Sequence, residues 1–244
     1  MPPRPSPTHF LCIPLVTAVS HRQLSASLSS FRADVTSPES FGIPDQAIRP
    51  IGTLHLTLGV MSFPKNEGLE EAVALLKTII PRQILADIAA PPPTKQAAEV
   101  GGLPGPLPPP LLVTLKSLHT MQSAAKASVL YAPPIDNGIL TKFCEELRSA
   151  FQKAGLMMED NRPLLLHATI LNTIYVKGKN ASRGGKGKSR EKLTIDARQI
   201  LDRYEDYLWM EDVPIEKIAI CKMGAKKQEN GDEAYEVEAE IDMV

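Results

Sequence analysis

The sequence predicts an α+β fold built from two similar lobes. Each lobe is expected to be an antiparallel sheet with helices packed outside it. A pseudo-two-fold duplication relates the lobes across a central cleft. Three observations support this prediction. Apolar residues alternate in some segments and recur at helical spacing in others. The order of these segments repeats along the 244 residues, and each repeat holds one His-x-Thr pattern inside an apolar run.

The first repeat is predicted from its periodicity. In order, it should contain a strand over 8–16, a helix over 20–35, a strand around His55, a helix over 67–80 and a strand over 111–118. Ser20 is a residue type that caps helix N-termini, so we expect it to cap the first helix. Pro64 should end the His55 strand and Pro81 the second helix, because proline has no N–H to donate.

The second repeat has the same order. It should contain a strand over 129–132, a helix over 136–151, a strand over 164–176 that includes His167, a helix over 196–208 and a strand over 215–221. A last strand over 235–241 follows, with Gly231 in the turn before it. This internal duplication predicts two similar lobes that face each other across a groove.

Two segments stand apart in composition. Residues 91–110 hold eight prolines and three glycines, and residues 177–192 hold seven Lys or Arg. We predict a disordered tail over 1–7 and one domain over 8–242, with these two segments as insertions. The Pro-rich insertion is a loop or hinge, or a ligand for a partner domain. The basic insertion is a solvated loop, a nuclear localisation signal or a contact to an RNA backbone.

Composition narrows the class of protein. The net charge of −1 makes no global case for nucleic acid, and three scattered cysteines fit neither a disulfide framework nor a zinc knuckle. The apolar run 10–19 loosely imitates a signal peptide, but Pro14 interrupts it and its alternation fits a strand. No run approaches the ~20 apolar residues of a membrane span. We therefore expect no membrane partner.

The two His-x-Thr copies are the candidate site. A strand turns alternate side chains to opposite faces, so each His should share a face with the Thr two residues later. The predicted front faces are Thr53, His55 and Thr57 in one strand, and His167, Thr169 and Thr173 in the other. The predicted packed backs are Leu54, Leu56, Leu58 and Val60, and Leu164, Leu166, Ala168 and Ile170. Two such strands would line one cleft.

Two imidazoles that face one substrate suit a reaction in which one proton is removed and another is delivered. Threonine hydroxyls beside them can donate hydrogen bonds to phosphate oxygens. The alternative for either copy alone is a core histidine beside a β-forming threonine, but of the five histidines only His55 and His167 precede Thr or Ser by two positions. A metal site would require carboxylates or a third His, and neither strand has them. We expect no metal and no cofactor.

These residues resemble a known family. His55-Leu56-Thr57-Leu58 and His167-Ala168-Thr169-Ile170 resemble the paired H-x-T-x motifs of the 2H phosphoesterases, the LigT-like superfamily. The runs 8–15, 48–54 and 163–169 are similar to one branch of it, the kinase-A-anchor-protein-7-like phosphoesterase domain. That domain also forms the C-terminal part of the activating signal cointegrator complex subunit 1. The resemblance covers about residues 8–242 outside the two insertions.

The resemblance implies a bilobal fold and phosphodiester chemistry on RNA ends, 2′,3′-cyclic phosphates or 2′,5′-linked nucleotides. It implies His55 and His167 as catalytic acid and base, and Thr57 and Thr169 as phosphate-binding residues. The sequence leaves open which histidine is the acid. It also leaves open a catalytically silent RNA- or nucleotide-binding module of a nuclear transcription-coactivator or DNA-repair complex, and a scaffold that docks through its Pro-rich loop.

The expected partners follow from these hypotheses. The ligand is an RNA or nucleotide phosphodiester, and subunits of a helicase or coactivator complex are candidate protein partners. We expect a monomer located in the nucleus, the cytoplasm or both.

Overall fold

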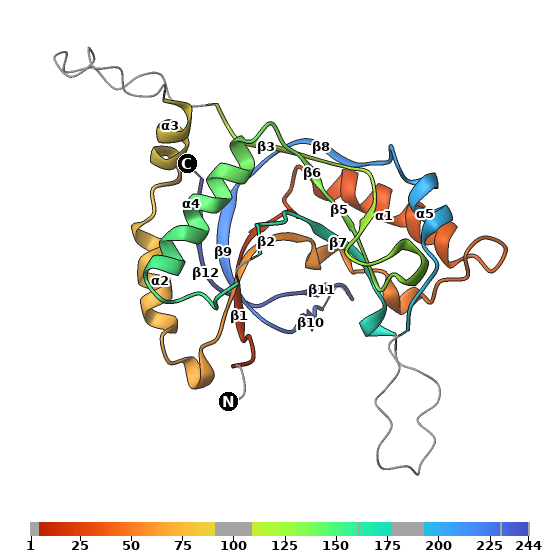
Figure 1. The fold of residues 1–244 in the computed structure, drawn as a ribbon, viewed down its shortest axis with the longest axis horizontal. Helices are drawn as coiled ribbons and strands as arrows, with labels where there is room; N and C mark the ends of the chain where they lie inside the picture. Colours follow the sequence, from red (N-terminus) through yellow and green to blue (C-terminus); the bar gives the residue numbers. More distant parts are fainter. Residues whose placement is uncertain (1–4, 91–108, 161, 177–192, 230, 244) are drawn as a thin grey trace, which may run out of the picture.

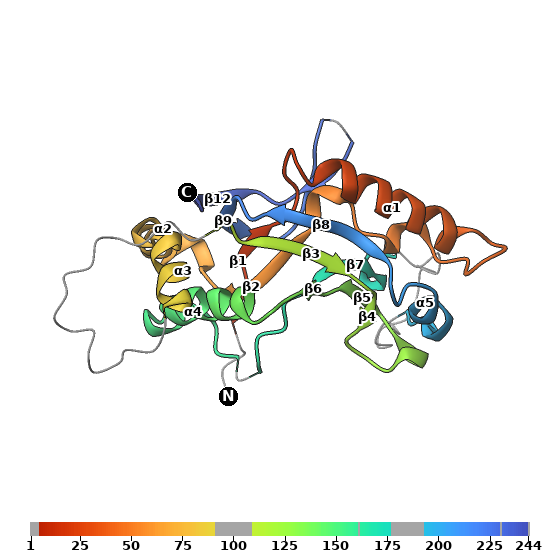
Figure 2. The ribbon, with the colours of Figure 1, turned by 90° about the horizontal axis from the view of Figure 1, so that it is seen from above.

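The computed structural model of the protein describes residues 5–90, 109–160, 162–176, 193–229 and 231–243. Antiparallel sheets form the middle of the molecule, and helices α2, α3 and α4 gather at one end while α1 and α5 lie at the other (Figures 1 and 2). The helices are α1 (His21–Thr36), α2 (Leu69–Thr78), α3 (Pro81–Ala89), α4 (Ile139–Lys153) and α5 (Arg198–Arg203). The predicted α+β fold with two lobes is confirmed.

The first lobe is a four-stranded sheet in the order β12-β9-β1-β2, in which every neighbouring pair is antiparallel. Its strands are β1 (His9–Pro14), β2 (His55–Met61), β9 (Lys217–Lys222) and β12 (Val237–Asp242). A small hairpin of β10 (Lys226–Lys227) and β11 (Glu233–Ala234) joins β9 to β12, and Gly231 lies in its turn with a φ of 85°. The positive φ explains why the turn position suits glycine.

The second lobe consists of two short sheets, β6-β3-β8 and β4-β5-β7. Its strands are β3 (Leu112–Lys116), β4 (His119–Thr120), β5 (Val129–Ala132), β6 (Pro134–Ile135), β7 (Ala168–Asn172) and β8 (Leu208–Pro214). β3 runs into β4 through Ser117, which has a φ of 71°, and β5 runs into β6 across Pro133. The pair β3–β6 of one short sheet therefore continues into the pair β4–β5 of the other, while β8 and β7 each complete one sheet.

The two lobes are not the two halves of the sequence. β3 belongs to the first repeat but lies among strands of the second, while β9 belongs to the second repeat and pairs with β1. The helices cross over in the same way, because α1 contacts β8 and α4 contacts β2. Each repeat thus completes the lobe of the other, and neither lobe is complete without residues from both halves of the chain.

Several predicted boundaries are corrected by the structure. Ser20 precedes α1 as predicted, but its hydroxyl donates to Leu15 O at 2.6 Å instead of capping the helix. Pro81 follows the end of α2 and also begins α3, where its fixed φ is compatible with a first helical turn. The helix predicted over 196–208 is only α5, and its last predicted residue already opens β8.

The back of the first motif strand is a core position. Leu54, Leu56 and Leu58 are 3%, 0% and 1% exposed, as their alternation predicts. Replacing Leu56 with alanine is expected to lower the free energy of unfolding by about 2–5 kcal/mol, because it leaves a cavity in this packed interior. Chemical denaturation of the variant measures the loss. Leu165→Ala is the control: this side chain is 49% exposed, so a change above about 0.5 kcal/mol would contradict the account.

The remaining predictions concern a membrane span, the N-terminal tail and the two insertions. Within the described residues, no helix is both long and apolar enough to cross a membrane. Residues 5–7, part of the predicted tail, are exposed. Most of the Pro-rich segment and the whole basic segment 177–192 lie outside the described residues, so their predicted character stays a prediction.

Candidate active site

The two motifs meet where the lobes join. β2 is the edge strand of the first sheet and contacts β7 of the second. The chain just before β2 is tied to the second motif, because the Arg49 N–H donates to Ile170 O at 2.9 Å and Ile48 forms an isolated bridge with Leu171. The structure therefore brings together the two His-x-Thr runs that the sequence separates by 112 residues.

Both motif strands carry a β-bulge at the same position. Thr57 and Gly59 pair with consecutive residues of β1, and Thr169 and Leu171 pair with consecutive residues of β5. The residues left over are Leu58 and Ile170, which hold the last place of each H-x-T-x motif. Bulges bend a strand and re-aim its side chains. The duplication thus extends from the order of elements to the local shape of the site.

The bulge corrects one predicted face. Val60 was expected beside Leu56 and Leu58, but it packs against a separate apolar cluster that contains Phe10 and Cys12. The extra residue at the bulge shifts the alternation by one position, so side chains beyond it change faces. This second cluster lies on the same side of the sheet as His55, whose ring contacts that of Phe10.

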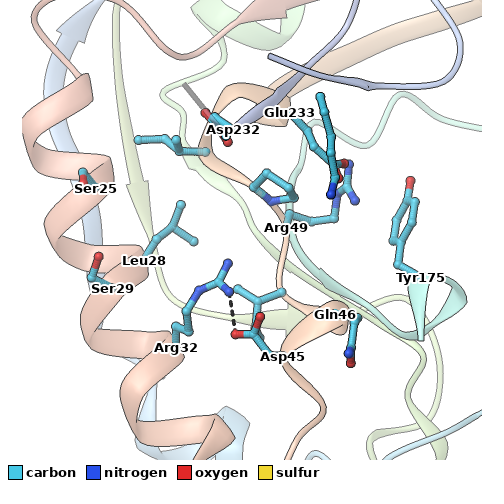
Figure 3. A pocket seen from close by; sticks show the side chains of 15 residues that line it. Ser25, Leu28, Ser29, Arg32, Asp45, Gln46, Arg49, Tyr175, Asp232 and Glu233 are labelled. Atoms are coloured by element: carbon cyan, nitrogen blue, oxygen red, sulfur yellow. Dashed lines mark hydrogen bonds and ion pairs between the residues drawn. The ribbon is translucent and has the colours of Figure 1, made fainter. Parts of the chain in front are cut away.

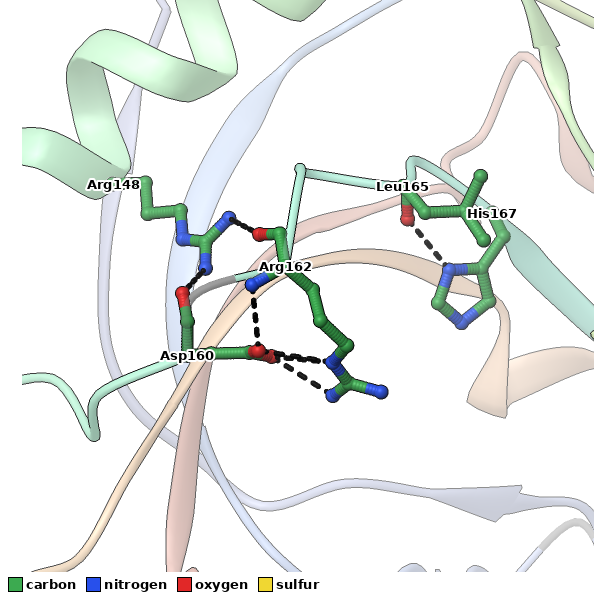
Figure 4. A network of polar contacts seen from close by, with 5 residues as sticks. All are labelled: Arg148, Asp160, Arg162, Leu165 and His167. Carbon is green, nitrogen blue, oxygen red and sulfur yellow. Dashed lines mark hydrogen bonds and ion pairs between the residues drawn. The ribbon is translucent and has the colours of Figure 1, made fainter.

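Both imidazoles are oriented by the backbone carbonyl two residues earlier. Nδ1 of His55 lies 2.8 Å from Thr53 O, and Nδ1 of His167 lies 2.7 Å from Leu165 O (Figure 4). A carbonyl only accepts, so each Nδ1 carries a hydrogen and donates it. In the neutral ring Nε2 then holds the lone pair, and in the protonated ring it holds a second proton. Each histidine therefore offers Nε2 for proton transfer.

The two rings differ in how easily they take up a proton. The pKa of His55 is lowered to about 4, mainly by burial and further by the charges of His167 and Arg49, while the Thr53 carbonyl opposes the shift. Burial also lowers the pKa of His167 from its usual 6.5, against the effect of the Leu165 carbonyl. The lowering is larger for His55, and the charge of His167 is one of its causes, so the pair takes its first proton on His167. At neutral pH His55 is neutral.

The two threonines of the motifs keep their hydroxyls for a ligand. In the described part of the chain, no hydrogen bond engages the side chain of Thr57 or Thr169, and both residues are half-buried. The prediction that Thr53 and Thr173 also lie on these front faces is wrong. The Thr53 hydroxyl donates to Pro50 O at 2.7 Å, and the buried Thr173 hydroxyl donates to Leu193 O at 2.6 Å. Both lie beyond the ends of the strands, where alternation no longer holds.

Aromatic rings surround the imidazoles. The ring of His55 lies 4.7 Å from that of Phe10 and 5.3 Å from that of Tyr235, and the ring of His167 lies 5.4 Å from that of Tyr131. Burial is the main cause of the lowered pKa values of both imidazoles, and these rings form part of their surroundings. Sequence reasoning missed these residues, and no motif in the sequence distinguishes them.

A further residue missed from the sequence is Arg49. Its guanidinium carbon lies 3.9 Å from the centre of the Tyr175 ring, and the residue is 5% exposed. Arg49 lines a cavity of about 710 Å³ (Figure 3). The lining does not include the four motif side chains, so the cavity does not contain the histidine pair. Arg49 links the two, because it lines the cavity and its charge acts on His55. An Arg-Pro pair precedes each motif: Arg49-Pro50 before His55 and Arg162-Pro163 before His167. This repetition was the one available sequence signal for Arg49.

The second Arg-Pro pair has different surroundings. The Arg162 side chain is 84% exposed and its guanidinium donates to the carboxylate of Asp160 at 2.8–3.2 Å (Figure 4). Arg148 donates to the main-chain carbonyls of both residues and holds this turn against α4. The site is therefore symmetric in its His and Thr side chains but asymmetric in its arginines.

The chain matches one protein family and is similar to two curated proteins. A family model described as the AKAP7 2′5′ RNA ligase-like domain matches residues 7–243. The uncharacterized protein C15D4.13c of Schizosaccharomyces pombe is 32% identical over 123 residues, which cover 50% of this chain and 53% of that protein. Mouse activating signal cointegrator 1 complex subunit 1 is 25% identical over 165 residues, covering 63% and 41%. The chain thus spans about half the length of the curated relatives it matches.

Solved structures share the fold. The protein TT0787 of Thermus thermophilus aligns with a TM-score of 0.52 at 15% identity over 97% of both chains. Escherichia coli LigT in complex with 3′-AMP aligns with a TM-score of 0.50 at 16% identity, over 97% of this chain and 98% of that one. At such identities the likeness establishes the fold alone. With the family match, it confirms the resemblance to the LigT-like 2H phosphoesterases.

Proposed function

Because the chain belongs to the family of the AKAP7 2′5′ RNA ligase-like domain, we propose that it is a metal-independent phosphodiesterase. Its substrates are RNA ends, 2′,3′-cyclic phosphates or 2′,5′-linked nucleotides. The observation that carries this proposal is the paired geometry of His55 and His167, each with Nδ1 held by a carbonyl and Nε2 left for the substrate. The 3′-AMP bound to E. coli LigT supports a nucleotide as the ligand class.

The different pKa values of the two rings assign the roles. His55, neutral above about pH 4, is the base, and His167, which takes the first proton, is the acid. On a 2′,3′-cyclic phosphate, His55 Nε2 removes a proton from the water that attacks phosphorus. The bond from phosphorus to one ribose oxygen breaks, and His167 Nε2–H protonates that oxygen. The product is a phosphomonoester, and the second half of the proton cycle restores the pair.

The threonines stabilise charge in this mechanism. As water attacks, negative charge grows on the two non-bridging oxygens of the phosphate. Thr57 shares a face of β2 with His55, and Thr169 lies two residues after His167, which immediately precedes β7, so both hydroxyls can donate to these oxygens. Donors already in place when charge develops lower the barrier without reorganisation. This role requires no metal ion.

The pH dependence of hydrolysis follows from the same assignment. The reaction needs neutral His55 and protonated His167. Activity should rise as pH increases through about 4, where His55 loses its proton. It should fall as pH increases through the pKa of His167, which lies below 6.5. We expect a bell-shaped profile of kcat/KM with its maximum between these limits, measured on a 2′,3′-cyclic nucleotide. A profile that rises steadily to about pH 8 would contradict the assignment.

A substrate panel tests the proposed function. The purified chain is incubated with EDTA and, in turn, with RNA ending in a 2′,3′-cyclic phosphate, a 2′,5′-linked diadenylate and its 3′,5′-linked isomer. We expect hydrolysis of at least one of the first two at a rate that EDTA does not change. Failure to cleave any of them would contradict the enzyme proposal, and a loss of rate in EDTA would contradict its metal independence.

A second candidate function is supported by one comparison. The mouse relative is by name a subunit of the activating signal cointegrator 1 complex, and it aligns with 63% of this chain. On this basis the domain would bind an RNA end or nucleotide without turnover inside a nuclear transcription or repair assembly. Nucleotide binding without hydrolysis of any panel member, together with co-purification of helicase or coactivator subunits, would favour this function over the first.

A further inference from the structure

The guanidinium of Arg49 is buried without a hydrogen-bond partner for its Nη2 atom among the described residues. No carboxylate of the described chain lies within ion-pair distance of it. The guanidinium lies against the face of the Tyr175 ring and interacts with the Tyr235 hydroxyl through its charge and a side-chain hydrogen bond, so the unsatisfied atom is Nη2 alone. Burying a cation without a counter-charge and with a donor nitrogen unsatisfied is costly, so such groups are normally ion-paired and fully hydrogen-bonded. A cation retained in this state fits an anionic ligand that completes its coordination.

We propose that Arg49 binds a second phosphate group of the nucleotide whose scissile phosphate lies between His55 and His167. The inference rests on the proposed function and extends it to the substrate class: a nucleotide that carries a phosphate at its 5′ side in addition to the one at its 3′ end. The backbone supports this position, because the Arg49 N–H is bonded to Ile170 O of the second motif. The positive charge of Arg49 also reaches His55.

The adjoining cavity has room for this part of the ligand. Its volume of about 710 Å³ lies in the range of small-molecule sites. Tyr175 is 42% exposed and stands at the cavity with its ring against Arg49 (Figure 3). An exposed aromatic ring beside an arginine is a surface on which a nucleobase can stack. The cavity therefore offers both a phosphate contact and a stacking surface.

Net charge does not explain the preference for an anion. The charged side chains that line the cavity are three basic and three acidic ones: Arg32, Arg49, Lys227, Asp45, Asp232 and Glu233. Asp45 is ion-paired with Arg32, and Asp232 accepts the Gly52 N–H at 2.9 Å. Arg49 differs from the other two cations because it is buried and has an unsatisfied nitrogen. The specificity lies in this single group.

The pseudo-symmetry supplies a matched comparison. Arg162 occupies the equivalent Arg-Pro pair before the second motif, but it is exposed and bonded to Asp160. Of these two arginines, only the one on the His55 side thus has a buried guanidinium with an unsatisfied nitrogen. This asymmetry gives the cleft a direction, so that a two-phosphate ligand binds in one orientation across the two histidines.

Equilibrium binding of adenosine 3′-monophosphate and adenosine 3′,5′-bisphosphate tests the proposal without requiring turnover. We expect the wild-type chain to bind the bisphosphate about 10- to 100-fold more tightly, as a charge-assisted hydrogen bond to a buried partner predicts. Arg49→Met keeps the apolar stem and should reduce this ratio to about one. Arg49→Lys should retain part of it. Arg162→Ala is the matched control and should keep the wild-type ratio. Thermal unfolding confirms that each variant is folded.

The outcomes separate the two claims. Equal affinity of the wild-type chain for both ligands, or an unchanged ratio in both Arg49 variants, overturns the phosphate site and leaves the proposed function standing. If neither ligand binds, the nucleotide function itself fails, and the inference that rests on it fails as well. A ratio lost equally in Arg162→Ala would also overturn the proposal, because it would show that any positive charge near the cleft suffices.

Discussion

Replacing His55 or His167 with alanine is expected to lower kcat/KM by about 10²- to 10⁴-fold in each case, the range for loss of a general acid or base. The two losses should be of similar size, because the geometry gives each ring the same carbonyl contact and the same free Nε2. Steady-state hydrolysis of a 2′,3′-cyclic nucleotide measures the effect. The affinity for a 3′-mononucleotide should change far less, since the threonine hydroxyls remain.

A matched control separates catalysis from a general effect of removing histidine. His21 is exposed at the start of α1, away from both motif strands, so His21→Ala should hydrolyse the substrate at the wild-type rate. Substantial activity in either motif variant, within about threefold of wild type, would contradict a paired acid–base mechanism. It would favour the function of a binding module.

Replacing Thr57 or Thr169 with valine is expected to lower kcat by about 10²- to 10³-fold, as the loss of one oxyanion donor does in other enzymes. Valine keeps the branched shape that suits a strand and removes only the hydroxyl, so the sheet should be unaffected. The serine variants should recover most of the rate because they restore a donor. Single-turnover rates on the same cyclic nucleotide separate this chemical step from product release.

The control for this pair is Thr78→Val. Thr78 ends α2, and its exposed hydroxyl donates to Leu75 O. Its loss should leave kcat unchanged. A serine variant at Thr57 or Thr169 that is as slow as the valine variant would contradict the hydrogen-bond role and indicate a packing role instead.

Periodicity located most of the elements, because apolar alternation and helical spacing reflect the burial of each segment. It could not locate features that arise from pairing between segments. The bulges at Leu58 and Ile170 depend on the register with β1 and β5, so alternation alone placed Val60 on the wrong face. Pro81 was seen as the end of a helix, although proline is equally suited to begin one.

The residues of the candidate site were likewise predictable only in part. The four motif residues could be predicted because the pattern occurs twice and at equivalent points of a repeat. Their neighbours could not, because Phe10, Tyr131 and Tyr235 reach the histidines only through the tertiary fold. Arg49 and Arg162 each stand in an Arg-Pro pair shortly before a motif, six residues before His55 and five before His167, and nothing in these local sequences shows which one is buried. The difference between them, a ring on one and a carboxylate on the other, appears only after folding.

The central claim is that the two histidines act as one unit on a single phosphodiester. The most direct measurement is kcat/KM on a 2′,3′-cyclic nucleotide for wild type, His55→Ala, His167→Ala and the variant that carries both changes. The effects of replacing residues that act as a unit are strongly non-additive. The double variant should therefore be at most a few fold slower than the slower of the two single variants. Single losses that multiply in the double variant would show that the histidines act independently and would contradict the claim.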